Sequence, residues 1–228
     1  MKFNIIFLLL GLTVCSFNSY SQEAINPTDA QGKPHGVWKK YYEGTTQLRY
    51  EGEFRHGKEI GEFKFYCEAC KNQPEAILNY NDKDNTVQVQ YFNAKGNLVS
   101  EGKMKDKNRE GEWITYHKNS TVPMVKENYA NGKLNGKKTV YFANGSPTEE
   151  LQYKNGFKDG ENLYYAPSGV VIKRLFYKND QLHGPATYYD AHGTIVIEGS
   201  YKEDLKDGLW KYYKNGNLIL EDTFPKKR

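Results

Sequence analysis

The sequence lacks the features of several common protein classes. No window of its 228 residues shows sustained helical periodicity, so we predict essentially no helix. Leucine, isoleucine and valine are scarce beside 19 tyrosines, which favours a thin, partly wet sheet over a thick aliphatic core. Acidic and basic residues alternate and leave a net charge of only +4, so no large field of one sign is present to attract nucleic acid.

Sequence motifs that carry catalysis are also missing. We find no nucleophile elbow, no phosphate-binding glycine loop with its lysine, and no zinc-protease helix. Glutamates recur at Glu51, Glu101, Glu150 and Glu198, and we interpret them as rungs of a cross-strand charge ladder rather than as catalytic pairs. We therefore predict that the protein is not an enzyme and has no catalytic residues, no cofactor and no metal.

Only three cysteines are present, and two of them, Cys67 and Cys70, lie close together where a hairpin should turn. A thioredoxin-like redox pair would need a helix N-terminus, and a zinc site would need a second pair of ligands. The favoured interpretation is a small disulfide that closes a long hairpin loop in an exported protein. Two free thiols are the alternative, because a two-residue gap makes a tight ring.

The N-terminus has the features of a secretory signal. Residues 1–21 hold one early charge, an apolar run from Phe3 to Val14 that is too short to span a bilayer, and small residues before Gln22. We predict a signal peptide over residues 1–21 and export to the periplasm, the cell envelope or the medium. A lipid anchor at Cys15 is the less favoured alternative, because Val14 replaces the small residue expected before the cysteine. Residues 22–33 are expected to form a flexible leader, and residues 225–228 a basic tail.

Nearly all of the remaining sequence is one repeat with a period of 24–25 residues. A glycine opens seven of the eight units, and Thr86 stands at the remaining place. The opening glycines are Gly36, Gly61, Gly111, Gly136, Gly160, Gly184 and Gly208. A tyrosine follows five residues later in every unit: Tyr41, Tyr66, Tyr91, Tyr116, Tyr141, Tyr165, Tyr189 and Tyr213.

Each unit predicts a β-hairpin. Its first segment is rich in aromatic residues that favour strands, including Trp38, Trp113 and Trp210, and ends at turn formers such as Asn215-Gly216. Hairpins stacked edge to edge would pair every strand with a neighbour. We therefore predict an all-β, elongated, single-layer antiparallel array of about eight stacked hairpins over residues 34–224. Trp210 and Tyr213 are three residues apart, so either both faces of the sheet carry aromatic residues or a bulge intervenes.

The units resemble MORN repeats, and more narrowly the bacterial MORN variant grouped with YwqK-type antitoxin proteins. The resemblance rests on Gly-x-Trp-x-x-Tyr-Tyr-x-x-Gly units that return through strands such as Glu198-Gly199-Ser200-Tyr201. It implies an antitoxin or an interaction scaffold, and MORN arrays elsewhere are implicated in protein and membrane-lipid contacts. The signal sequence departs from a cytoplasmic antitoxin, and the third unit departs from the pattern because Thr86 and Gln88 replace the glycine and the aromatic residue.

These observations favour an exported, non-enzymatic scaffold that binds a protein partner through its aromatic and charged rows. The alternative is a cell-envelope module that binds a glycan or a lipid surface. No nucleic acid partner is expected. Aromatic rings packed against each other would favour the scaffold, whereas a row of exposed ring faces along a groove would favour glycan binding.

Overall fold

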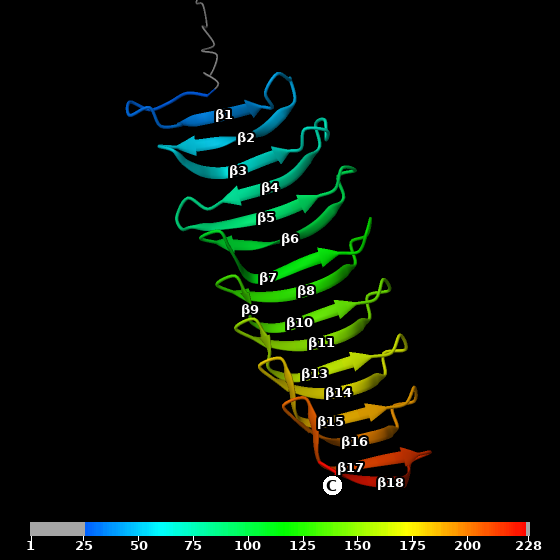
Figure 1. Cartoon of the computed structure of the whole chain (residues 1–228). Helices are drawn as coiled ribbons and strands as arrows, with labels where there is room; N and C mark the ends of the chain where they lie inside the picture. The colour runs from blue at the N-terminus through cyan, green and yellow to red at the C-terminus, as the bar shows by residue number, and fades with distance from the viewer. Residues whose placement is uncertain (1–25, 227–228) are drawn as a thin grey trace, which may run out of the picture.

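The computed structural model describes residues 26–226 and places them in one open sheet of 18 antiparallel strands (Figure 1). The described residues contain no helix, and so none that could cross a membrane. The all-β prediction is confirmed. The expected signal peptide over residues 1–21, including Cys15, lies outside the described residues.

The strands follow one another through the sheet in the order of the sequence, as the blue-to-red colouring of Figure 1 shows. Their bounds are β1 (Gly36–Tyr41), β2 (Leu48–Arg55), β3 (Lys58–Tyr66), β4 (Pro74–Tyr80), β5 (Thr86–Phe92), β6 (Leu98–Lys105), β7 (Asn108–Tyr116), β8 (Pro123–Ala130), β9 (Lys133–Leu134), β10 (Gly136–Tyr141), β11 (Pro147–Lys154), β12 (Phe157–Lys158), β13 (Gly160–Tyr165), β14 (Val171–Lys178), β15 (Gln181–Tyr189), β16 (Ile195–Lys202), β17 (Leu205–Lys214) and β18 (Asn217–Phe224).

The long strands form stacked hairpins, each made of a first strand and a return strand. The hairpins are β1–β2, β3–β4, β5–β6, β7–β8, β10–β11, β13–β14, β15–β16 and β17–β18. Each return strand also pairs with the first strand of the next hairpin, for example β16 with β17. The short strands β9 and β12 lie in the connections that lead from one hairpin to the next. The predicted elongated array of hairpins is confirmed.

Each hairpin contains a β-bulge, where the return strand has one residue more than the first strand. In the last hairpin, Tyr212 lies opposite Leu220 and Tyr213 opposite Leu218, so Ile219 has no partner on β17. Trp210 and Tyr212 pack in one apolar cluster, whereas the Tyr213 hydroxyl bonds Glu198 on the other face. Of the two possibilities raised by the spacing of Trp210 and Tyr213, the first holds, because both faces carry aromatic rings. The bulge adds Ile219 to β18 and does not come between Trp210 and Tyr213 on β17.

We name the two faces by their residues. The core face carries Phe63, Val89, Trp113, Leu175, Ala186 and Trp210, all of which are buried. The charged face carries Lys39, Glu51, Lys64, Tyr66, Glu101, Tyr116, Lys126, Glu150, Arg174, Glu198, Lys211 and Tyr213.

Side chains on the core face are matched in size between hairpins. The residue two places after the opening glycine of a unit, or Val89 in the third unit, packs on the residue eleven positions earlier in the preceding return strand. A ring packs on a glycine, a small side chain on a leucine, and a lysine on a glutamate. The pairs are Gly52 with Phe63, Leu78 with Val89, Gly102 with Trp113, Glu127 with Lys138, Leu151 with Asn162, Leu175 with Ala186, and Gly199 with Trp210.

The third hairpin is shifted by one residue relative to the repeat that the sequence suggested. Its bulge lies between Tyr91 and Phe92, one residue later than in the other hairpins, and β4 pairs with β5 without irregularity. The glycine at the corresponding place in the second hairpin, Gly61, has a φ of +62°, whereas Thr86 does not adopt a positive φ. Val89 consequently takes the core position, with 1% of its surface exposed.

This shift corrects the place of Tyr91 in the tyrosine series. Tyr91 lies on the core face, with its ring centroid 6.5 Å from that of Trp113. Phe92 occupies the position that the repeat tyrosine has in the other hairpins, opposite the first residue of the return strand, Leu98. A tyrosine does stand five residues after the start of the third unit. It is not structurally equivalent to the repeat tyrosines of the other hairpins.

An arch formed by residues 26–34 covers the outer edge of β1. The Trp38 indole donates to the carbonyl of Pro27 over 2.8 Å, and Asn26 exchanges side-chain hydrogen bonds with the backbone of Lys39. Pro27 stands eleven residues before Trp38, so it takes the place that a return-strand residue has elsewhere. The leader expected over residues 22–33 includes this hydrogen-bonded arch.

Candidate binding surface

Tyrosine hydroxyls and glutamates bridge neighbouring hairpins on the charged face. The Tyr66 hydroxyl donates to Glu51 over 2.7 Å, Tyr116 to Glu101 over 2.5 Å, and Tyr213 to Glu198 over 2.6 Å. Each bond joins a tyrosine at the end of a first strand to the return strand before it. The glutamates singled out by the sequence therefore hold tyrosine rings in fixed positions on this face.

Lysine side chains also lie close to glutamates on this face. Lys39 lies 3.3 Å from Glu51, Lys137 2.6 Å from Glu150, and Lys211 4.0 Å from Glu198. These pairs are solvent-accessible, so each contributes little to stability. Their main effect is to fix where charge stands on the surface.

The hydrogen bonds between tyrosine and glutamate raise the pKa of the tyrosine and lower that of Glu51. Burial and the bond to Glu51 raise the pKa of Tyr66, and burial together with Glu101 raises the pKa of Tyr116 to about 12. The hydrogen bond from Tyr66, followed by Lys39 and Lys64, lowers the pKa of Glu51. At neutral pH the tyrosines are therefore neutral donors and the glutamate is ionised.

Charge alternates from the third to the seventh hairpin at one position of the return strand, whereas the second hairpin has Ile77 there and the eighth has a further glutamate, Glu221. This position lies opposite the residue that follows the core residue of each first strand, such as Ile114 after Trp113. It holds Glu101 in the third hairpin, Lys126 in the fourth, Glu150 in the fifth, Arg174 in the sixth and Glu198 in the seventh. Because each hairpin advances the sheet by about 10 Å, like charges repeat every ~20 Å. The glutamates were predicted from the sequence, whereas the basic residues between them were missed. A comparison of units two repeats apart would have revealed them.

The aromatic residues predicted for binding have different surroundings. Trp113, Trp210 and Tyr66 are buried, whereas Tyr41 and Tyr91 are 47% and 39% exposed. The others are half-buried: Trp38, Tyr116, Tyr141, Tyr165, Tyr189 and Tyr213. Trp113 and Trp210 belong to the packing between hairpins, so their ring faces are not exposed on the surface.

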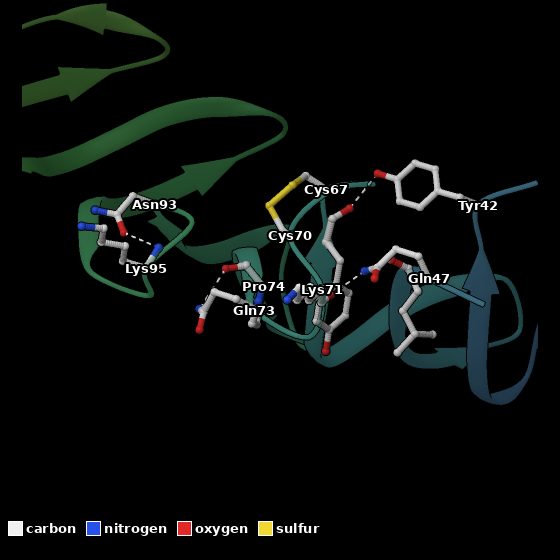
Figure 2. The surroundings of a disulfide bond; sticks show 11 residues. Tyr42, Gln47, Cys67, Cys70, Lys71, Gln73, Pro74, Asn93 and Lys95 are labelled. Carbon is white, nitrogen blue, oxygen red and sulfur yellow. Dashed lines mark hydrogen bonds between the residues drawn. A yellow bond between two sulfur atoms is a disulfide. The ribbon is translucent and has the colours of Figure 1, made fainter. Parts of the chain in front are cut away.

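The two cysteines lie in the turn of the second hairpin and are joined by a disulfide (Figure 2). The turn is held against its neighbour, because Tyr42 donates to the carbonyl of Tyr66 and Gln47 to that of Lys71. Glu75 lies with both sulfurs in a group whose potential ligand atoms are within 4.8 Å of one another. Thiolates bind metals and disulfide sulfurs do not, so the closed disulfide leaves no metal site here.

An open hollow of about 610 Å³, with polar and apolar walls in similar measure, lies where the turns of the third and fourth hairpins meet. Its walls include Asn97, Asn119, Ser120 and Thr121, with Tyr116 beside them. The Asn97 amide donates to Asn119 over 3.0 Å and closes one side of the hollow. Amide and hydroxyl groups around a ring suit a polar, uncharged ligand.

The same hairpin, with a bulge before its terminal tyrosine and a charged return strand, recurs in β10–β11, β13–β14 and β15–β16. Residues 134–155, 158–179 and 182–203 match the MORN repeat variant family. The MORN repeat variant therefore covers these three hairpins, and the hairpins outside the match have the same bulge. No curated protein matches the chain.

Proposed function

We propose that this chain is an exported, non-enzymatic repeat scaffold that binds a protein partner on its charged face. The observation that carries the proposal is the alternation of Glu101, Lys126, Glu150, Arg174 and Glu198 along one line of the sheet. A row of fixed charges with alternating sign selects a partner whose charges have the same spacing and the opposite order.

The contacts of the glutamates support a binding role over a catalytic one. Glu51, Glu101 and Glu198 each accept a tyrosine hydroxyl, and Glu51 and Glu198 also face a lysine. These bonds hold the three carboxylates in position, and the bond from Tyr66 lowers the pKa of Glu51, which suits recognition. A general acid would instead need a raised pKa.

The packing of the aromatic rings favours a protein partner over a glycan. Glycan binding needs exposed ring faces in a row, whereas Trp113 and Trp210 are 3% and 1% exposed. The resemblance to YwqK-type antitoxin proteins supplies a narrower version in which the partner is a toxin. The signal expected over residues 1–21 argues for a partner outside the cytoplasm in that version.

Affinity capture from envelope extract tests the proposal with matched variants. The double variant Lys126→Glu/Arg174→Glu reverses the two basic rungs, and we expect it to lose the partner that the unmodified chain captures. The control is Lys133→Glu/Lys178→Glu, which changes the net charge equally at exposed positions outside the line. Binding should then be repeated with the purified partner. Equal capture by both double variants would contradict the proposal.

The hollow beside Tyr116 supports a second candidate, a glycan-binding module. Its amide and hydroxyl lining favours sugar hydroxyls. Under this candidate, Asn119→Ala would abolish binding to an envelope polysaccharide, and the charge-reversal variant would retain it.

A further inference from the structure

The last strand, β18, is an edge strand that carries apolar side chains in the open. Leu218, Ile219 and Leu220 are 50%, 62% and 50% exposed. Leu220 lies opposite Tyr212 as Ile197 lies opposite Tyr188 in the preceding hairpin. Ile197 packs against the core cluster because β17 lies beside it. The residues of β18 are thus those of a strand paired on both sides, although β18 pairs only with β17.

The two ends of the array differ. At the first end, the arch of residues 26–34 lies along β1 and hydrogen-bonds the Val37 carbonyl and both backbone groups of Lys39. At the other end, no residue of the described chain pairs with the outer side of β18. Natural edge strands usually carry a lysine, a proline or a bulge that prevents pairing. The stretch from Leu218 to Leu220 carries no charge. Its bulge at Ile219 does not prevent pairing, because β16 has the same bulge and is paired on both sides. This edge is therefore open to another strand.

Two interfaces within the sheet show what such a strand would meet. Lys64 lies opposite Glu51, and Tyr66 donates to the same carboxylate. Lys211 lies opposite Glu198, and Tyr213 donates to it. In both cases the tyrosine of a Lys-aromatic-Tyr sequence bonds the glutamate of the preceding return strand. The Lys211 ammonium lies 4.0 Å from its glutamate, whereas the Lys64 ammonium pairs with Glu62.

Glu221 is the equivalent glutamate of the last return strand. It lies opposite Lys211 as Glu51 lies opposite Lys39. Within residues 26–226 it makes no hydrogen bond and no ion pair, and it is exposed. The tyrosine hydroxyl that Glu51 and Glu198 receive from the next hairpin is missing at Glu221.

We propose that β18 binds an extended segment of a partner protein as an added antiparallel strand, through a Lys-aromatic-Tyr sequence whose lysine and tyrosine meet Glu221. The residue before the lysine is basic rather than aromatic, because Asp222 stands where Gly52 and Gly199 receive rings. The pair of Glu127 and Lys138, 2.8 Å apart, shows this arrangement inside the sheet.

A second copy of this chain does not offer the required segment. Its Lys-aromatic-Tyr sequences are Lys40–Tyr42, Lys64–Tyr66 and Lys211–Tyr213. The last two lie in strands that are paired on both sides. In the first, Lys40 and Tyr41 pair with β2 and Tyr42 is bonded to Gln47, while the arch bonds the neighbouring Lys39 backbone. The arch already bonds the outer edge of β1 at Val37 and Lys39, which opposes head-to-tail joining of copies through this part of β1. The site goes beyond the proposed function, because it lies at the end of the array and does not use the alternating charges. Either proposal can therefore be wrong while the other holds.

A synthetic peptide provides the probe. Ile-Gly-Glu-Lys-Lys-Phe-Tyr-Ser copies residues 60–67 with lysine in place of Phe63 and serine in place of Cys67. Its binding to the isotope-labelled chain is followed by backbone amide chemical shifts. We expect shifts confined to β17 and β18. Glu221→Gln should weaken binding about tenfold, the size of effect typical of a lost bond to a charged group. The control Glu203→Gln, an exposed turn residue, should bind as the unmodified chain does.

Three results would overturn the inference. The first is no shift at β18 with peptide up to about 1 mM, the weak limit of specific recognition. The second is equal binding by a scrambled peptide of the same composition. The third is light scattering that shows a dimer which Ile219→Lys dissociates and Leu205→Lys does not, because a second copy would then occupy the edge. Loss of partner binding by the Lys126→Glu/Arg174→Glu variant with the peptide site intact would support both proposals separately.

Discussion

Trp113 lies flat on Gly102, so closely that a Cβ added to the glycine would stand 2.3 Å from Cδ2 of the indole ring. The indole also donates to the carbonyl of Lys103 over 2.9 Å. The bulge between Gly102 and Lys103 brings this ring and backbone together. A ring on a glycine is therefore one way in which two hairpins of this array are joined.

Gly102→Ala should destabilise the protein by about 1–3 kcal/mol, the usual range for overpacking a filled site. Gly102 has an ordinary strand backbone, so the loss reports the contact with the ring and not backbone strain. Urea denaturation measures it. In the double variant Gly102→Leu/Trp113→Ala, which copies the pair of Leu175 and Ala186, we expect much of the stability of Gly102→Leu alone to be recovered. Strictly additive losses would contradict the matching of sizes.

In the third hairpin the buried residue is Val89 and not Gln88. Val89→Ala should cost about 1–3 kcal/mol, because Val89 is 1% exposed and its removal leaves a cavity. Gln88→Ala should change the free energy of unfolding by less than about 0.5 kcal/mol, as is usual for exposed positions. Thermal unfolding of the two variants decides between them, and a larger loss at Gln88 would reject the shifted register.

The bond between Tyr66 and Glu51 should make stability depend on pH. The folded pKa of Glu51 is lowered from 4.5, so its contribution is complete above the unfolded pKa and is lost as pH falls through the folded pKa. Tyr66→Phe removes the largest cause of the shift. We expect the variant to lose less stability than the unmodified chain between about pH 6 and pH 3.

Tyr41→Phe is the control for this pH dependence, because Tyr41 is 47% exposed and its hydroxyl makes no hydrogen bond among the described residues. Its unfolding profile should follow that of the unmodified chain at every pH. Identical profiles for Tyr66→Phe and the unmodified chain would remove Glu51 as the source of the effect.

Asn162 is fully buried, and its Nδ2 has no partner within the described chain. Its Oδ1 accepts from the backbone of Gln152 over 2.8 Å. We expect Leu151→Gly/Asn162→Trp, which copies Gly199 and Trp210, to be at least as stable as the unmodified chain, because it removes the unsatisfied amide. Each single substitution should lose about 2 kcal/mol or more, through a cavity or a collision. A double variant as unstable as the sum of its singles would show that the pairs are not interchangeable.

The architecture could be predicted because the repeat consists of residues with strong preferences for strands or turns. Turn formers such as Asn215-Gly216 and the recurring tyrosines fix the strands, the period and the openness of the array. The slip in the third hairpin was hidden because Tyr91 and Phe92 are both aromatic, so counting from Thr86 gave a complete series. The arch at Asn26 and Pro27 had no pattern because it binds mainly through backbone groups.

Only some residues of the candidate binding surface could be predicted from the sequence. The glutamates recur with one residue type and were found, whereas Lys126 and Arg174 take the same place in alternate hairpins and break the self-similarity. The pairs eleven residues apart were missed for the same reason, because a glycine opposite a tryptophan and a leucine opposite an alanine share no residue type. Complementarity between different residues leaves no repeat in the sequence.

The eleven-residue pairing also determines where the array can be divided or extended. Each pair joins the return strand of one hairpin to the first strand of the next, so Gly102 and Trp113 belong to different hairpins but to one packing module. A duplication or truncation that cuts between β6 and β7 separates them, whereas a cut in the turn at residues 93–97 keeps them together. The module that can be duplicated without loss therefore runs from one such turn to the next and contains the second half of one hairpin and the first half of its neighbour.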